Sequence, residues 1–136
     1  MKSKKAWIPR SVPKSRGKLT ESEKINIQSQ CQPLVEEFKK QYVQKNPDKQ
    51  FTYLTDVYTK WYQNYLYFCE KRESEHPNRI KDEFEEKFVR LEYAGKDRFK
   101  FSYFRHTGQW YLVATDMALN DCMEMMRSNP NFQPVG

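Results

Sequence analysis

Three short segments in the second half of the chain alternate between apolar and polar residues, and this alternation constrains the fold more than any other feature of the sequence. Alternation with a period of two is typical of β-strands that are covered on one face only. The segments span residues 87–93, 98–105 and 110–115, with turn-forming residues between them. We therefore expect three consecutive strands of an antiparallel sheet. The expected apolar faces are Val89, Leu91 and Tyr93 (against Phe88, Arg90 and Glu92), then Phe99, Phe101 and Tyr103, then Trp110, Leu112 and Ala114.

A run of aromatic and β-branched residues just before these segments predicts two further strands. Residues 50–62 and 65–72 have strand composition, and Gln63-Asn64 between them suits a two-residue hairpin turn. In that register Tyr62 faces Tyr65. One face of the hairpin then suits a core, because it carries Val57, Thr59, Trp61, Leu66 and Phe68.

The opposite face of this hairpin carries four tyrosines and is a candidate contact surface. A tyrosine has an apolar ring and a polar tip, so such a face can stack on a ligand or contact another protein. Cross-strand aromatic pairs also stabilise ordinary sheets, and a helix can cover such a face. We call this surface the tyrosine face; its residues are Tyr58, Lys60, Tyr62, Tyr65, Tyr67 and Lys71, with Cys69 among them.

Helical patterns flank the expected sheet on both sides in sequence. Thr20 and Glu23 form a capping-box pattern that opens a helix to about residue 45, with an apolar stripe that includes Leu34 and Phe38. Pro33 lies inside this helix, so we expect a kink or break near residues 29–32.

A second helix is expected from a cap at Asp116 to about Ser128, followed by a tail over residues 129–136. Its methionines suit either an irregular core or an adaptable binding groove, and the core is the commoner use. The charged residues 73–86 are most simply a solvated loop. A helical turn over residues 79–85 would place Ile80 and Phe84 on one face, but the pattern does not distinguish helix from strand in this segment.

The first 19 residues form an expected flexible basic arm. Of the 24 basic residues in the chain, seven lie in this segment, so the remaining 17 basic residues face 18 acidic ones. A segment of this composition buries too little apolar surface to order itself. It can tether the protein to nucleic acid through phosphate contacts, or it can be a solubilising tail. The basic residues are Lys2, Lys4, Lys5, Arg10, Lys14, Arg16 and Lys18.

Length and cysteine content exclude several classes of protein. A chain of 136 residues corresponds to one domain, which buries enough surface to fold without disulfides or metal. The three cysteines are odd in number and widely spaced, which argues against a secreted disulfide framework and against a zinc site. No apolar run is long enough to cross a membrane. We expect a soluble cytoplasmic protein with reduced thiols and no membrane partner.

The sequence contains no recognisable catalytic or cofactor-binding constellation. Its two histidines, His76 and His106, are expected in loops, and its four glycines are too dispersed for a phosphate-binding loop. Residues 98–104 resemble an RNA-binding strand in aromatic alternation but contain no glycine, and the order of elements differs from that fold. The question of an enzyme stays open, but the pattern favours a non-enzymatic protein without a cofactor.

We predict an α+β fold with an N-terminal helix, an antiparallel β-meander of about five strands and a C-terminal helix, in a single domain over residues 20–128. A curved sheet wrapped around the first helix would suit the same pattern. The predicted function is a small binding module whose basic arm contacts nucleic acid or an acidic protein. The alternative is a protein–protein or homo-oligomeric module that uses the tyrosine face. The sequence predicts no particular oligomeric state.

Overall fold

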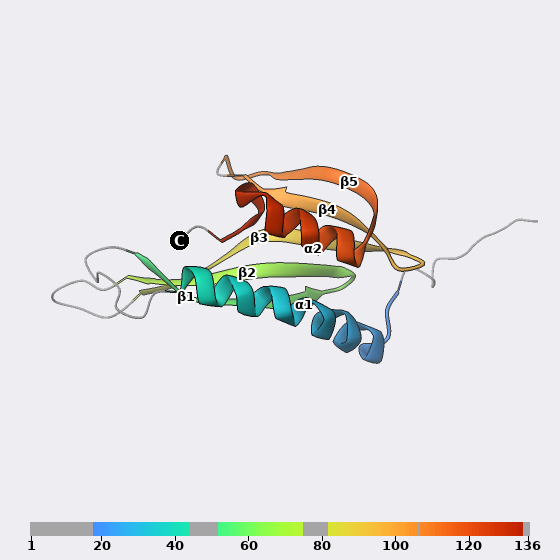
Figure 1. Ribbon diagram of the computed structural model, residues 1–136, viewed down its shortest axis with the longest axis horizontal. Helices are drawn as coiled ribbons and strands as arrows, with labels where there is room; N and C mark the ends of the chain where they lie inside the picture. Colours follow the sequence, from blue (N-terminus) through green and yellow to red (C-terminus); the bar gives the residue numbers. More distant parts are fainter. Residues whose placement is uncertain (1–17, 44–51, 75–81, 106, 135–136) are drawn as a thin grey trace, which may run out of the picture.

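The computed structural model describes residues 18–43, 52–74, 82–105 and 107–134. It confirms the predicted α+β arrangement of a helix, a five-stranded antiparallel sheet and a second helix (Figure 1). The strands lie in the order β1-β2-β3-β4-β5, so each pairs with its neighbour in sequence. The elements are α1 (Glu21–Tyr42), β1 (Tyr53–Tyr62), β2 (Tyr65–Ser74), β3 (Asp82–Gly95), β4 (Arg98–Phe104), β5 (Trp110–Ala118), α2 (Leu119–Ser128) and the 3-10 helix η2 (Pro130–Phe132).

Helix α1 begins at the predicted capping box and runs unbroken through its internal proline. The Thr20 hydroxyl accepts from the backbone N–H of Glu23, and the Glu23 carboxylate accepts from the backbone N–H of Thr20. Of the kink or break expected near residues 29–32, the break is wrong, because α1 is continuous from Glu21 to Tyr42. Pro33 faces solvent, whereas Leu34 and Phe38 are buried against the sheet. Tertiary packing of the apolar stripe therefore maintains the helix across the missing hydrogen bond.

Both helices pack on the same face of the sheet, and the core lies between these two layers (Figure 1). The predicted hairpin register is confirmed, with Tyr62 opposite Tyr65 and Trp61 opposite Leu66. The methionines of α2 belong to this core, as their commoner use predicts, and Met126 is fully buried. The largest fully buried side chains include Leu34, Leu54, Leu66, Phe68, Leu91, Phe99, Phe101 and Met126.

A bulge in β3 changes which residues face the core. Phe68 of β2 pairs with Val89, but the next residue, Cys69, pairs with Lys87, so Phe88 is the extra residue. Its ring lies 6.3 Å from the rings of both Phe38 and Phe68, and its side chain is buried. The prediction that Phe88 faces away from the core is therefore wrong, because the bulge interrupts the period-two alternation.

A second register shift affects β5. Leu112 pairs with Ser102 and Ala114 pairs with Phe101, which leaves Val113 as the extra residue. Leu112 is 58% exposed, so the prediction that Trp110, Leu112 and Ala114 share a core face is wrong. Trp110 and Leu112 lie on the face of the sheet opposite the helices, which we call the open face.

Two predicted boundaries also change. Residues 82–86, for which a loop was the simplest expectation and helix and strand both stayed open, are strand, because Asp82–Glu86 pair with β2. Asp116 is not a helix cap: β5 continues to Ala118, and Asp116 lies 3.6 Å from Arg98 in an ion pair. The other part of the expected loop, residues 75–81, lies outside the described residues.

The segment after α2, assigned to a tail by its sequence, packs against the core. Phe132 is buried, and its ring makes edge-to-face contacts with Phe101 at 5.0 Å and Tyr103 at 4.9 Å. Gln133 donates from Nε2 to the carbonyl of Met126, and its Oε1 accepts from the hydroxyl of Tyr42. The packed structure therefore extends beyond residue 128. Among the described residues, neither α1 nor α2 is long and apolar enough to cross a membrane.

We expect Phe132→Ala to lower the free energy of unfolding by about 3–5 kcal/mol, because it leaves a cavity between Phe101 and Tyr103. Urea unfolding followed by circular dichroism measures the change. Phe84→Ala is the matched control, because the Phe84 side chain is 45% exposed. This substitution should lower the free energy of unfolding far less. Equal effects of the two substitutions would contradict a structural role for the C-terminal segment.

Candidate functional site

The helices leave the tyrosine face uncovered. Gln28 of α1 donates from Nε2 to the carbonyl and the hydroxyl of Thr59, both at 3.1 Å, and the Trp61 indole donates to the carbonyl of Lys24 at 3.2 Å. Thr59 and Trp61 therefore face α1, and the residues that alternate with them face the other way. In the described part of the chain, neither helix packs on that open face (Figure 1).

Aromatic rings and cations gather near the centre of the open face. The rings of Tyr65 and Tyr67 are stacked 6.0 Å apart, and the Trp110 ring lies 5.8 Å from that of Tyr67. The Lys87 ammonium lies 5.4 Å from the Tyr67 ring. These residues come from β2, β3 and β5. We call the group formed by Tyr65, Tyr67, Lys87, Arg90 and Trp110 the aromatic–cationic cluster.

Arg90 is the central cation of this cluster. Its guanidinium carbon lies 5.0 Å from the Tyr65 ring and 4.7 Å from the Trp110 ring. Stacking of this kind orients the planar group through its flat faces and leaves the N–H groups at its edge for hydrogen bonds. Among the described residues, none forms an ion pair or hydrogen bond with the Arg90 guanidinium. The cluster thus presents an oriented donor group that suits a phosphate or carboxylate.

A second group on the open face is already neutralised by a carboxylate. Lys60 lies 2.6 Å from Oε2 of Glu85, and the Tyr58 hydroxyl donates to Oε1 of the same carboxylate. Both hydrogen bonds favour the ionised carboxylate and lower the pKa of Glu85 to about 2. The hydrogen bond from Lys60 has the larger effect and that from Tyr58 the smaller. Burial, followed by the hydrogen bond to Glu85, raises the pKa of Tyr58. Neither Tyr58 nor Lys60 is therefore a free contact group in the way that the sequence suggested.

The tyrosine face is thus divided in the structure. Tyr65 and Tyr67 join the aromatic–cationic cluster, whereas Lys71 lies 3.7 Å from Glu83 in an ion pair. Tyr62 is 61% exposed at the end of the hairpin. Cys69 is buried despite its position on this face.

Sequence reasoning missed Lys87 and Trp110 as members of the site. The alternating pattern predicts Lys87 as the first residue of a strand and places Trp110 on the core face. The register shifts at Phe88 and Val113 place these two residues on the open face. An alternating pattern contains no signal for a bulge when the inserted residue is itself apolar. Arg90 was expected to face outward, and the only available signal was its polar position in the alternation.

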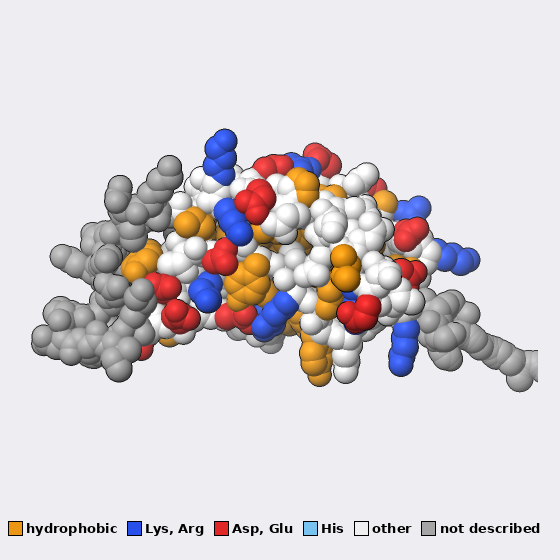
Figure 2. All heavy atoms as spheres, turned by 90° about the horizontal axis from the view of Figure 1, so that it is seen from below, with side chains coloured by type: hydrophobic (Ala, Val, Ile, Leu, Met, Phe, Trp, Pro, Cys, Tyr) orange, Lys and Arg blue, Asp and Glu red, His pale blue; other side chains and the backbone are white. Residues whose placement is uncertain are grey.

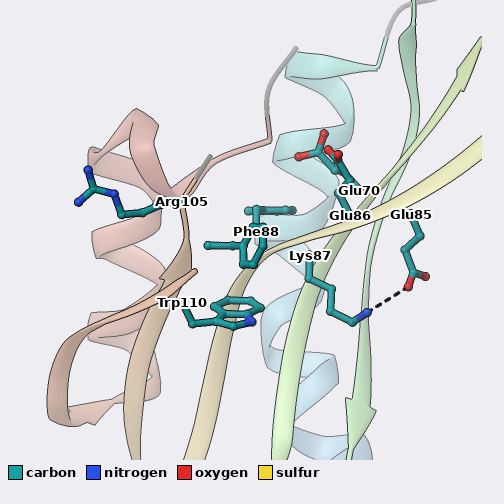
Figure 3. Close-up of a pocket in the computed structure, with 8 residues that line it drawn as sticks. Glu70, Glu85, Glu86, Lys87, Phe88, Arg105 and Trp110 are labelled. Atoms are coloured by element: carbon teal, nitrogen blue, oxygen red, sulfur yellow. Dashed lines mark hydrogen bonds and ion pairs between the residues drawn. The ribbon is translucent and has the colours of Figure 1, made fainter. Parts of the chain in front are cut away.

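A cleft of about 650 Å³ adjoins the cluster where β3 extends past the end of β4. Figure 3 shows Lys87 beside Trp110, with Lys87 turned toward Glu85 at 3.5 Å. Glu70 lies at the other end of the cleft and is nearly fully buried. Its carboxylate lies 2.7 Å from Arg72, which compensates the buried charge. The cleft therefore has an acidic, internally paired end and an aromatic, cationic end.

The side of the molecule formed by α1 and β1 has a different character. Lysine, arginine and acidic side chains are interspersed over this side (Figure 2). Lys39 of α1, for example, lies 3.4 Å from Asp56 of β1. Mixed charge of this kind is typical of a solvated surface and does not form a field of one sign.

The predicted arm residues lie almost entirely outside the described part of the chain. Only Lys18 is described, and it is exposed just before α1. The role of Lys2, Lys4, Lys5, Arg10, Lys14 and Arg16 therefore stays a prediction. The two histidines, His76 and His106, also fall outside the described residues.

The three cysteines are buried free thiols. Burial raises the pKa of Cys31 and of Cys122 to about 12, and that of Cys69 to about 11. Because the thiolate is the reactive form, none of these thiols is activated as a nucleophile. Within the described residues, histidines, cysteines and carboxylates form no group of three or more that could hold a metal ion.

Residues 19–134 match a known family, DUF3024, described as a domain of unknown function. The chain belongs to the DUF3024 family. The match spans α1, the whole sheet, α2 and η2, so the packed C-terminal segment is part of the DUF3024 domain. All seven basic residues of the arm, Lys18 included, precede the matched region. No curated protein and no solved structure matches the chain.

Glu85 should make the stability of this DUF3024 domain depend on pH. Its pKa in the folded protein, about 2, is below the ordinary value of 4.5. The ionised carboxylate therefore stabilises the fold above pH 4.5, and this contribution is lost as the pH falls toward 2. We expect the difference in unfolding free energy between wild type and Glu85→Gln to be constant near neutral pH and to shrink in that interval.

Urea unfolding at a series of pH values measures this difference. Lys60→Met is the partner variant, because it removes the strongest hydrogen bond to the carboxylate and should reduce the same pH-dependent contribution. A difference between wild type and Glu85→Gln that stays unchanged down to pH 2 would contradict the assignment.

Proposed function

We propose that this protein is a non-enzymatic binding module that holds single-stranded nucleic acid on the aromatic–cationic cluster. The observation that supports this best is the position of Arg90 between the rings of Tyr65 and Trp110, with no ion-pair partner among the described residues. Phosphate oxygens would accept from its guanidinium edge, and Lys87, which is paired with Glu85 at 3.5 Å, would add a partly neutralised second cation.

The aromatic part of the cluster suits unpaired bases. Every base has a flat π-face, so stacking on tyrosine and tryptophan tolerates many sequences. Tyr62 is exposed at the end of the same hairpin and offers a further ring. A double helix keeps its bases stacked on one another, so this surface favours a single strand.

In this proposal the basic arm supplies most of the long-range attraction. The remainder of the chain has 17 basic and 18 acidic residues, so its net charge attracts phosphates weakly. The seven basic residues of the arm would release counterions on contact with the strand, while the cluster would position it. We further propose that the protein acts in the cytoplasm, where free thiols stay reduced.

The second candidate is a protein-contact module that uses the same open face. Two observations favour this candidate: Tyr62 is exposed, and the Arg90 guanidinium is oriented so that it can bind a carboxylate. An acidic protein could pack on the Tyr62 ring and pair a carboxylate with Arg90. The two candidates differ in their salt dependence and in their ligand, so one set of measurements separates them.

Fluorescence anisotropy with short single-stranded RNA and DNA over a salt series tests the nucleic-acid proposal. We expect Trp110→Ala to weaken binding by about 1–3 kcal/mol through lost stacking, with little change in the salt slope. Arg90→Gln should reduce the slope of log K against log salt by about 0.7, the value for one phosphate contact on a single strand. Removal of residues 1–17 should reduce the slope further.

Lys40→Gln is the matched control, because it removes one exposed positive charge from α1 instead of from the open face. It should leave affinity and slope nearly unchanged. Absence of binding by the full chain at low salt would rule out the nucleic-acid proposal and leave the protein-contact module. Binding that Trp110→Ala and Arg90→Gln do not alter would place the contact on the arm alone.

A further inference from the structure

Strand β5 is the outermost strand of the sheet, and its first half is apolar on both faces. Figure 1 shows it at one edge of the sheet, with β4 as its only neighbouring strand in the described part of the chain. Tyr111, Leu112 and Val113 are 40%, 58% and 40% exposed. No charged residue occurs from Trp110 to Thr115. Such a continuous apolar run is typical of a strand with neighbours on both sides, not of an edge.

The other edge of the same sheet is protected by charge. Strand β1 carries Asp56, which pairs with Lys39, and Lys60, which pairs with Glu85. A register shift at Thr55 also interrupts its pairing with β2. Charged side chains and bulges are the usual means by which proteins prevent edge-to-edge association. The chain therefore protects one edge of its sheet and leaves an apolar segment at the other.

We propose that a second copy of this chain pairs with β5, antiparallel and across a two-fold axis, through residues 110–113. With the axis at Tyr111, Trp110 lies opposite Leu112 of the second copy; with the axis at Leu112, Tyr111 lies opposite Val113. Both registers place apolar residues of the segment against apolar residues. The nearest charge is the Arg105 guanidinium, 4.5 Å from the Tyr111 ring, and with the axis at Leu112 the two Tyr111 rings are not directly opposite each other. The segment is therefore complementary to itself, as an interface between identical copies requires.

The register shift at Val113 sets the length of this interface. Beyond it the pairing of β5 with β4 shifts once more, between Ala114 and Met117, and Asp116 lies 3.6 Å from Arg98 in an ion pair. A charge at that position marks the end of the neutral segment. The pairing is thus confined to the first half of β5, where the exposed apolar side chains are concentrated.

The assembly would have a defined shape. A two-fold axis perpendicular to the sheet keeps the same face of both copies on the same side. The two sheets would form one ten-stranded sheet with both α2 helices on one side and both aromatic–cationic clusters on the other. Trp110 is part of both the aromatic–cationic cluster and β5. The clusters of the two copies would therefore lie near the interface between the two β5 strands. The inference stands without the proposed function, because it rests on the edge alone.

Sedimentation velocity over about a hundredfold range of protein concentration tests the proposal with the full chain. We expect wild type to change from monomer to dimer as the concentration rises. Leu112→Lys should weaken dimerisation by about tenfold or more, because it brings two positive charges close to the axis. Ile25→Lys is the matched control: Ile25 is 61% exposed on α1, away from β5, and its substitution should leave dimerisation unchanged.

Hydrogen exchange adds a readout specific to the strand. Amides of residues 110–113 should become more protected as the concentration rises, whereas amides of β1 should not. Circular dichroism verifies that Leu112→Lys keeps the fold. A wild type that stays monomeric at every concentration overturns the proposal. So does a dimer that Leu112→Lys leaves intact, or one in which β5 gains no protection.

Discussion

Burial of the apolar stripes of two helices against one face of the sheet is the interaction on which the rest of the structure depends. It maintains α1 through Pro33, because Leu34 and Phe38 pack on the sheet while the proline faces solvent. The C-terminal segment joins the same core, because the Phe132 ring packs beside Phe101. Because both helices use the same face, the opposite face of the meander remains open in the described part of the chain, and the candidate contact groups lie there (Figure 1).

Two bulges then decide what the open face contains. An extra residue in a strand reverses the faces of every residue beyond it. In β3, the bulge at Phe88 buries a ring and places Lys87 on the open face, where Arg90 already lies by regular alternation. In β5, the shift at Val113 moves Trp110 out of the core and beside Arg90. The cluster is therefore a product of irregular pairing, although the residues themselves are ordinary members of alternating strands.

Electrostatics divides the open face into an occupied and an available part. Glu85 accepts from Lys60 and Tyr58, so these two side chains already have a partner within the sheet. The distribution of charge also distinguishes the two edges, since β1 carries paired ions and the first half of β5 carries none. The same chain thus combines a protected edge, an apolar edge and a central cation oriented by aromatic rings.

The sequence by itself determined the order of the elements, the capping box at Thr20 and the hairpin register at Gln63-Asn64, because these depend on neighbouring residues and on local hydrogen bonds. It also identified Tyr65 and Tyr67 as contact candidates. Only the tertiary structure decided that Glu85 would neutralise Lys60, that Lys87 and Trp110 would join Arg90, and that Phe132 would belong to the core. These outcomes depend on bulges and on contacts between residues far apart in the chain, for which hydrophobic periodicity contains no signal.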